Sequence, residues 1–204
     1  MVARAVKCYD FAENQCKYVM LCRRAAGRRP YEIIVRLYDK LKFEIIRRTI
    51  MRAVLTRVNS ASVTIDGRVN GKIGKGFLIL LGVGPNDTEK ECRYLAEKAL
   101  GLRIFEDENG KMNLGLDAVH GEVLVVSQFT LYGNCRKGRR PSFTDAAEPG
   151  LGNTLYEKFL TICSELGYPP QHGEFGADMK VESINDGPVT LILDTDQLMN
   201  EPRR

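Results

Sequence analysis

The sequence lacks any apolar segment long enough to cross a membrane. A spanning helix needs roughly 18 or more consecutive apolar residues, whereas the longest run here is Phe77–Val83. Low-complexity tracts are absent and 27% of the residues are charged, which excludes a collagen-like fibre and a wholly disordered chain. With 204 residues, 44% of them hydrophobic, we expect a soluble protein of one domain, or one domain plus an appendage.

Zinc-binding cysteine spacings are also missing. Six cysteines are present, but none forms a CxxC pair, which argues against a structural metal site. No apolar signal core follows Met1, so nothing favours secretion, and we expect reduced thiols in a cytoplasmic protein. Cys92 and Cys163 fall on the apolar faces of predicted helices, where packing explains them.

The familiar catalytic signatures are absent too. There is no GxSxG elbow, GxxxxGK[ST] loop, HExxH helix or GxGxxG turn, which excludes the standard hydrolase, kinase and dehydrogenase assignments. Only two histidines occur. His120 lies in a Gly-flanked turn and His172 follows two prolines in a loop, so we expect surface residues rather than general bases.

Positive charge is concentrated in the first fifty residues. Residues 1–50 contain 12 Lys and Arg against 5 Asp and Glu, a net of +7, whereas residues 51–204 contain 18 against 21, a net of −3. The first segment shows a weak helical pattern over Tyr31–Ile46 and has no serine, unlike a mitochondrial targeting peptide. We interpret residues 1–50 as a basic extension of unknown role that precedes an alternative start at Met51.

From Met51 onward the pattern predicts strands and helices in a regular order. Ala53–Ile65 alternates and returns through Asp66-Gly67 into Arg68–Ile73, a hairpin signal. Phe77–Val83 is apolar without alternation, as in a central strand covered on both faces. The other expected elements are a helix capped by Asn86 or Asp87 and ending at Gly101, strands at Leu102–Phe105 and Glu122–Tyr132, a loop over Gly133–Gly152, a helix at Thr154–Leu166, and strands at Met179–Ile184 and Val189–Leu193.

This order, β-β-β-α-β-β-α-β-β, predicts an α/β fold of the α+β kind. We expect a mixed, strongly curled sheet that approaches a barrel, with two helices packed on it. The predicted domain covers residues 51–196, and residues 197–204 form a short tail.

Two short motifs stand where strands end. Ser127-Gln128-Phe129-Thr130 follows the buried run Val123–Val126, and its hydroxyls, amide and backbone N–H groups can meet a polar ligand or an oxyanion. The alternative is that Ser127 and Thr130 satisfy local backbone groups while Phe129 enters the core. The second motif, Asn185–Pro188, reads as a turn whose Gly187-Pro188 bond is either trans or a specified cis bond.

One local basic patch stands out from the acidic domain. Its four cations lie in the Gly133–Gly152 loop, and a loop this long usually carries function. Phosphate is a natural partner, and a solvated charged loop is the alternative. The four residues are Arg136, Lys137, Arg139 and Arg140.

Six motifs, in order, resemble the D-aminoacyl-tRNA deacylase family from Met51 to about Thr195. The two signature motifs of that family are SQFT at Ser127 and NDGPVT at Asn185. SQFT lies within the longer motif VLVVSQFTLYG from Val123, and the other four are MRAVLTRVNSASVTIDG from Met51, GFLILLGV from Gly76, LRIFEDENGKMNL from Leu102 and RPSF from Arg140.

The resemblance implies hydrolysis of the ester in D-aminoacyl-tRNA and in mischarged glycyl-tRNA, without a metal or organic cofactor. It implies a homodimer in which a cis Gly187-Pro188 turn enters the partner's active site, and tRNA rather than DNA or a membrane as partner. Ser127, Gln128, Phe129 and Thr130 would line the reacting ester. Ala147 and Gly187 would offer carbonyls to the amino group, and Phe175 and Met179 would border the adenosine.

Two routes to hydrolysis stay open under this resemblance. The adenosine 2′-OH assists an attacking water, which we favour, or Thr130 acts as a nucleophile, although no base is visible beside it. Two other functions also remain as alternatives. They are a non-catalytic module that holds a tRNA end and a small-molecule amidohydrolase that needs no RNA.

Overall fold

The structure is a computed structural model that describes residues 6–10, 15–19 and 51–200. The chain divides into two compact units, residues 1–47 and 48–204, each described by itself. In the first unit, β1 (Val6–Asp10) pairs antiparallel with β2 (Gln15–Val19). The helical pattern predicted over Tyr31–Ile46 lies outside the described residues.

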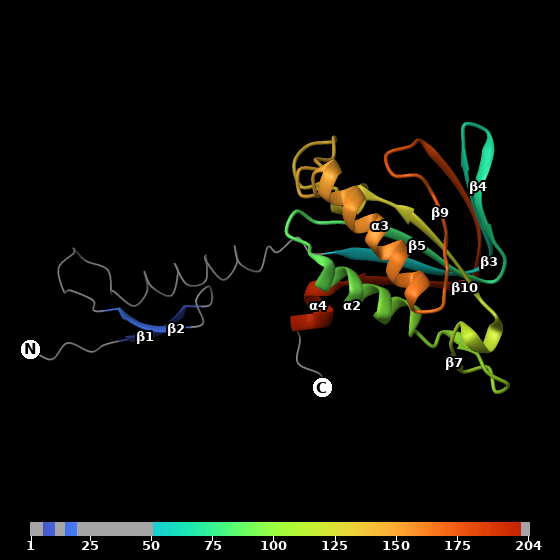
Figure 1. Cartoon of the computed structure of the whole chain (residues 1–204), viewed down its shortest axis with the longest axis horizontal. Helices are drawn as coiled ribbons and strands as arrows, with labels where there is room; N and C mark the ends of the chain where they lie inside the picture. The colour runs from blue at the N-terminus through green and yellow to red at the C-terminus, as the bar shows by residue number, and fades with distance from the viewer. Residues whose placement is uncertain (1–5, 11–14, 20–50, 201–204) are drawn as a thin grey trace, which may run out of the picture. The chain divides into compact units, whose positions relative to one another are not determined.

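The second unit is built on a six-stranded mixed sheet with the order β10-β3-β5-β8-β9, and β4 pairs with β3. The pairs β5·β8 and β8·β9 are parallel, whereas the others are antiparallel. The sheet curls strongly, as Figure 1 shows, which confirms the predicted fold class. Its strands are β3 (Arg52–Ile65), β4 (Arg68–Ile73), β5 (Gly76–Gly82), β8 (Glu122–Ser127), β9 (Gln171–His172) and β10 (Met179–Asp194).

The first hairpin forms where the sequence predicts it. Asp66 has φ 50° and Gly67 has φ 77°, so both central residues of the turn are left-handed. That is the conformation of the two-residue turn that matches the twist of paired strands. Asp66-Gly67 therefore determines the register of β3 on β4.

The central strand β5 is covered on both faces, as predicted. Phe77, Ile79 and Leu81 belong to the larger core with the helices, whereas Leu78 lies in a second cluster with Leu124. Helices α2 (Glu89–Leu100) and α3 (Pro149–Glu165) pack against the larger core (Figure 1).

The two helix cysteines are buried in that larger core. Burial raises the pKa of the Cys92 and Cys163 thiols to about 12, so both remain protonated. The packing interpretation of these two residues is confirmed.

The predicted cap of α2 is wrong. Thr88 is the N-cap, and its side chain and Glu91 form a capping box. Asp87 is instead buried, and its carboxylate accepts hydrogen bonds from the N–H groups of Met51 (2.7 Å) and Gly84 (2.6 Å). Asp87 thus ties the start of β3 to the β5–α2 loop.

Several boundaries differ from the prediction because tertiary pairing decides them. The Leu102–Phe105 strand is β6 (Phe105–Glu106), paired with β7 (Met112–Leu114), and α3 begins before Thr154 at Pro149. The strand expected to reach Tyr132 ends at Ser127 and passes into a 3₁₀ helix, η2 (Phe129–Tyr132). The sequence prediction also omitted β7, η1 (Asp117–Val119), β9 and α4 (Thr195–Asn200), and α4 spans the predicted 196/197 boundary.

The last two predicted strands are one strand, β10, and the motif between them is not a hairpin turn. Both halves pair with β3, because Asn185 lies opposite Val58 and Thr190 lies opposite Thr56. The extra residues between these pairs form a bulge in a continuous strand. We call this segment, Asp186–Val189, the β10 bulge. Among the described residues, no helix is long and apolar enough to cross a membrane.

Candidate functional site

The candidate site lies where two parallel strands end. Leu81 of β5 pairs with Ser127 of β8, and the N–H of Gln128 then donates to the Leu81 carbonyl at 2.7 Å. Because the two parallel strands end at the same edge of the sheet, the segments that follow β5 and β8 enter the same space. A cavity of about 330 Å³ lies there, lined by Leu81, Val83, Ser127, Gln128, Phe129, Phe143, Ala146, Ala147, Pro149, Gly152, Tyr156, Phe175 and Gly176.

The SQFT side chains do not serve the core. Phe129 is 58% exposed, and Gln128 Nε2 donates to Thr130 Oγ1. Within the described residues, the Ser127 hydroxyl has no hydrogen-bond partner, and Ser127 lines the cavity. The interpretation of this motif as local backbone satisfaction with a buried phenylalanine is therefore wrong.

Thr130 has no base beside it among the described residues. Its hydroxyl is paired with the Gln128 amide, which does not take up a proton whichever way the amide is turned. A threonine hydroxyl without a base is a weak nucleophile. The Gln128–Thr130 pair therefore offers polar groups that can bind a ligand, without a base that would activate the hydroxyl.

The opposite wall is held by backbone contacts. The N–H of Ala147 donates to the Val83 carbonyl at 2.9 Å, which anchors the loop before α3 against the end of β5. A Cβ atom on Gly152 would lie 3.0 Å from the Phe175 ring, so a glycine here lets that ring pack against α3. Tyr156 is buried, and its hydroxyl contacts the carbonyls of Val125 (3.0 Å) and Gly173 (3.1 Å).

Of the nine predicted catalytic and substrate-binding residues, four do not line this cavity. The structure brings together Ser127, Gln128, Phe129, Ala147 and Phe175, whereas Thr130 stands beside them through its bond to Gln128. Met179 packs against the second hydrophobic cluster. Gly187 and Pro188 are exposed in the β10 bulge, on a different strand from the cavity walls.

Arg57 holds the β10 bulge, and sequence reasoning missed it. The side chain is 3% exposed, and its Nε lies 3.1 Å from both the carbonyl and a carboxylate oxygen of Asp186. Its Nη1 donates to the Ile104 carbonyl at 2.6 Å. The sequence did contain a signal for Arg57. It is a charged residue at an inward-facing position of the alternating run Ala53, Leu55, Arg57. The adjoining Gly187-Pro188 bond is cis.

The four predicted phosphate contacts lie together on a closed loop. Asn134 and Ser142 pair through two backbone hydrogen bonds of 2.7 and 3.0 Å, and Arg136, Lys137, Arg139 and Arg140 lie between them, all exposed. None of the four has an acidic partner in residues 51–200. We call residues 134–142 the basic loop.

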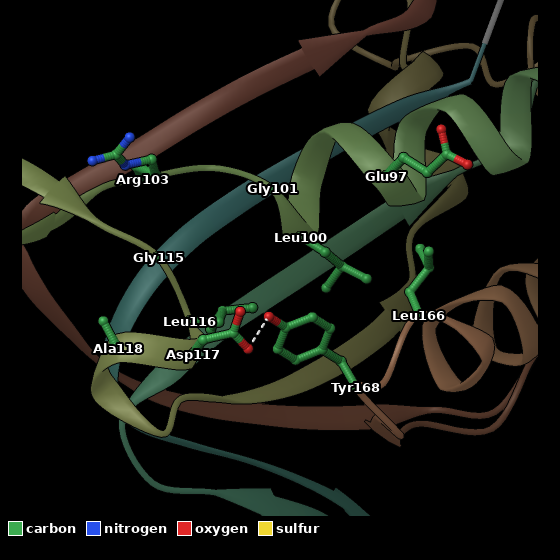
Figure 2. Close-up of a pocket in the computed structure, with 10 residues that line it drawn as sticks. All are labelled: Glu97, Leu100, Gly101, Arg103, Gly115, Leu116, Asp117, Ala118, Leu166 and Tyr168. Atoms are coloured by element: carbon green, nitrogen blue, oxygen red, sulfur yellow. Dashed lines mark hydrogen bonds between the residues drawn. The ribbon is translucent and has the colours of Figure 1, made fainter.

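A second hollow, of about 410 Å³, lies at the end of α2 (Figure 2). Figure 2 shows Asp117 and Tyr168 pointing toward one another, and Tyr168 donates to the Asp117 carboxylate. Arg103, at its rim, is bonded to Asn113. Because these polar groups already pair within the protein, this hollow is the weaker candidate. No group of His, Cys, Asp and Glu that could hold a metal ion occurs in the described part of the chain.

The structure is a small α/β domain in which hydroxyl, amide and backbone groups surround a cavity at the strand ends of a curled mixed sheet. The chain belongs to the D-aminoacyl-tRNA deacylase family and is a hydrolase: the model of the D-Tyr-tRNA(Tyr) deacylase family matches residues 54–194.

Relatives and solved structures agree with this family. The chain is 61% identical over 145 residues to a D-aminoacyl-tRNA deacylase of Desulfatibacillum aliphaticivorans, covering 71% of this chain and 99% of that one. It is 55% identical over 145 residues to one of Thermosipho africanus, covering 71% and 97%.

Two solved structures are similar over the same part of the chain. One, titled c-Myc DNA Unwinding Element Binding Protein, has a TM-score of 0.66 and 40% identity and covers 70% of this chain and 97% of that one. The other, titled as a probable eukaryotic D-amino acid tRNA deacylase, has a TM-score of 0.63 at 17% identity and covers 71% and 98%, so it supports the fold alone.

Proposed function

We propose that this chain hydrolyses the ester bond of D-aminoacyl-tRNA and releases the D-amino acid and free tRNA. The observation that carries the proposal is the cavity in which Ser127, Phe129 and Ala147 meet at the strand ends. The relatives that share 54–61% identity with the chain are named for this activity.

The reaction needs a positioned water and a place for the negative charge that develops on the ester oxygen. An aminoacyl ester is already activated, so positioning and charge stabilisation are sufficient without a strong base. The first N–H groups of a 3₁₀ helix have no partner within that helix, and in η2 these belong to Phe129 and Thr130. These two N–H groups are suited to binding an oxyanion. Ser127 and Gln128 orient the ester, and the adenosine 2′-OH assists the water.

The terminal adenosine occupies the side of the cavity bordered by Phe175, with Met179 beyond it. Phe175 packs beside Tyr156 at 6.1 Å between ring centroids, which gives an aromatic wall against which a base can stack. The basic loop contacts phosphates of the same RNA through Arg136, Lys137, Arg139 and Arg140.

Chirality is selected by backbone carbonyls rather than by side chains. The carbonyls of Ala147 and of Gly187 capture the substrate ammonium group, so an L side chain points into the wall and a D side chain points outward. Glycine has no side chain to reject, and glycyl-tRNA is therefore also a substrate.

The Gly187 carbonyl comes from a partner subunit in a homodimer. Gly187 and Pro188 are exposed and do not line the cavity of their own chain, which supports a role in a second copy. On the same strand Ile184 is 62% exposed and Ile192 is 75% exposed, so β10 presents apolar side chains that a second copy could cover. A two-fold axis makes such an interface reciprocal, so each subunit completes the other.

The catalytic domain is residues 51–196, without a requirement for residues 1–50. Relatives of about the length of this part match it almost end to end, with 97–99% of their own length covered. A chain that begins at Met51 is expected to keep deacylase activity, measured with charged tRNA.

The direct test is loss of the ester from charged tRNA. D-tyrosyl-tRNA, L-tyrosyl-tRNA and glycyl-tRNA are incubated with the protein, with free D-tyrosine ethyl ester as a fourth substrate. We expect rapid release from the D and glycyl forms only. Binding without release identifies a non-catalytic module, and equal release from the free ester identifies an RNA-independent hydrolase.

A further inference from the structure

An exposed aromatic pair forms part of the cavity lining and is next to the basic loop along the chain. The rings of Phe129 and Phe143 meet edge to face with centroids 5.3 Å apart, and both side chains are exposed. Phe129 belongs to η2, whereas Phe143 follows the basic loop directly. Two exposed phenylalanines in contact leave apolar ring surface that a folded domain usually buries.

The basic loop carries four exposed cations without an acidic partner in the described part of the chain. The Asn134–Ser142 pair closes the loop, so four positive charges are confined to five consecutive positions with no acidic partner in the described part of the chain. One hydrogen bond and one glycine shape the loop further. The N–H of Arg136 donates to Asn134 Oδ1 at 3.1 Å, and Gly138 has a φ of 68° at the tip. Confined like charges repel one another, and a bound polyanion removes that repulsion.

The two features are adjacent along the chain. Arg140 is three residues from Phe143, which corresponds to at most about 11 Å of extended backbone. Cations that follow a phosphate backbone next to aromatic rings that stack bases are the combination by which proteins hold single-stranded nucleic acid. Because both rings line the cavity, a strand that leads to a terminal nucleoside in the cavity can lie across the aromatic pair.

We propose that Phe129, Phe143 and the basic loop form a second RNA subsite, which holds the single-stranded nucleotides immediately before the terminal adenosine of the tRNA. The base next to the adenosine stacks on the Phe143 ring, and Arg139 and Arg140 contact the phosphates that precede it. This inference rests on the proposed function, because it assumes that an aminoacyl-adenosine occupies the cavity.

The experiment compares two substrates that share the reacting ester. One is D-tyrosyl-tRNA, and the other is the D-tyrosyl ester of adenosine alone, which cannot reach the basic loop. The readout is the ratio of kcat/KM for tRNA to that for the adenosine ester, because a general loss of catalysis or folding cancels in this ratio.

Two variants test the two parts of the subsite separately. Phe143→Leu is expected to lower the ratio at least about fivefold, since one base no longer stacks. Arg139→Gln with Arg140→Gln is expected to lower it about tenfold at low salt. The same pair should also reduce the slope of log kcat/KM against log salt by about 0.7 for each phosphate that is no longer neutralised. Lys98→Gln on α2, an exposed cation away from the loop, is the matched control and should leave the ratio unchanged.

The outcomes separate this inference from the proposed function. If the unaltered protein cleaves neither substrate, the proposed function fails. If the unaltered protein cleaves both substrates and the ratio of kcat/KM for tRNA to that for the adenosine ester is near one, the second subsite is overturned. It is also overturned if both variants have the same ratio as the Lys98 control. Competition by an unrelated DNA strand as strong as that by an RNA ending in CCA would also overturn it, since it would identify a general single-strand surface.

Discussion

At the scale of single residues, Asp87 is a carboxyl group that the fold buries. It is 4% exposed, and burial raises its pKa to about 7, although hydrogen bonds from Gly84 and Met51 act in the opposite direction. Between pH 4 and 7 the folded protein therefore binds a proton at Asp87 that the unfolded chain has released. The protonated Asp87 carboxyl therefore stabilises the folded protein at low pH, and this stabilisation is lost as the pH rises through about 7.

Asp87→Asn should remove this pH dependence. The contribution of Asp87 has a slope of at most about 1.4 kcal/mol per pH unit, and the amide of Asn does not ionise. Urea unfolding from pH 4.5 to 7.5 should show the stability of the unaltered protein falling relative to the variant. A constant difference between the two proteins across this range would contradict the burial argument.

Thr130 tests which group attacks the ester. Its hydroxyl is paired with Gln128 and has no base beside it in the described residues, so Thr130→Ala is expected to lower kcat for D-tyrosyl-tRNA by less than about tenfold. Loss of a covalent nucleophile typically costs about 10⁴-fold or more. Thr161→Ala, an exposed threonine on α3, is the control.

The companion measurement changes the substrate instead of the protein. A tRNA that ends in 2′-deoxyadenosine should be cleaved more slowly than intact tRNA is cleaved by Thr130→Ala. If Thr130→Ala instead slows cleavage more than removal of the 2′-OH does, Thr130 is the nucleophile.

At the scale of elements, the β10 bulge is the segment whose geometry depends on one glycine. Gly187 has φ 124°, and a Cβ atom there would lie 2.8 Å from Val189 Cγ2 and 2.9 Å from Arg57 Nη2. Gly187→Ala is therefore expected to destabilise the domain by about 1–3 kcal/mol and to displace the bulge. We expect D-tyrosyl-tRNA hydrolysis or its preference over the L form to fall at least about tenfold.

The hairpin glycine is a matched control for this change. Gly67 also has a positive φ, but no atom lies within 4 Å of an added Cβ. Gly67→Ala should cost about 1–2 kcal/mol of stability with unaltered activity on both stereoisomers. Equal effects of the two substitutions on the D-to-L ratio would argue against a role of the bulge in chiral selection.

At the scale of the whole molecule, the exposed Ile192 of β10 tests the proposed homodimer. Ile192→Glu places a charge on a side chain that is 75% exposed in the single chain, so it should disturb an interface and leave the fold intact. We expect the native mass measured by light scattering to fall from two chains to one, with loss of deacylation. Met112→Glu, an exposed apolar residue of β7, should change neither. A protein that is already a single chain before substitution, yet active, would contradict the shared site.

The residue pattern by itself determined the elements that rest on local interactions. Asp66-Gly67 predicts its hairpin because both positions adopt left-handed conformations, and the unbroken apolar run predicts β5 because a central strand meets apolar neighbours on both faces. The SQFT motif could be placed directly after the buried run Val123–Val126, although the strand was predicted to continue to Tyr132. Its residues are consecutive, so no fold is needed to bring them together.

The tertiary structure alone decided what depends on distant partners. The end of β8 is determined by pairing with β5, and β10 is continuous because both of its halves lie on β3. Arg57 is 129 positions from Asp186, so the sequence does not indicate that one buried guanidinium holds the bulge. The cavity likewise requires the ends of β5, β8 and α3 to converge, since a pocket is formed by packing and not by the order of residues.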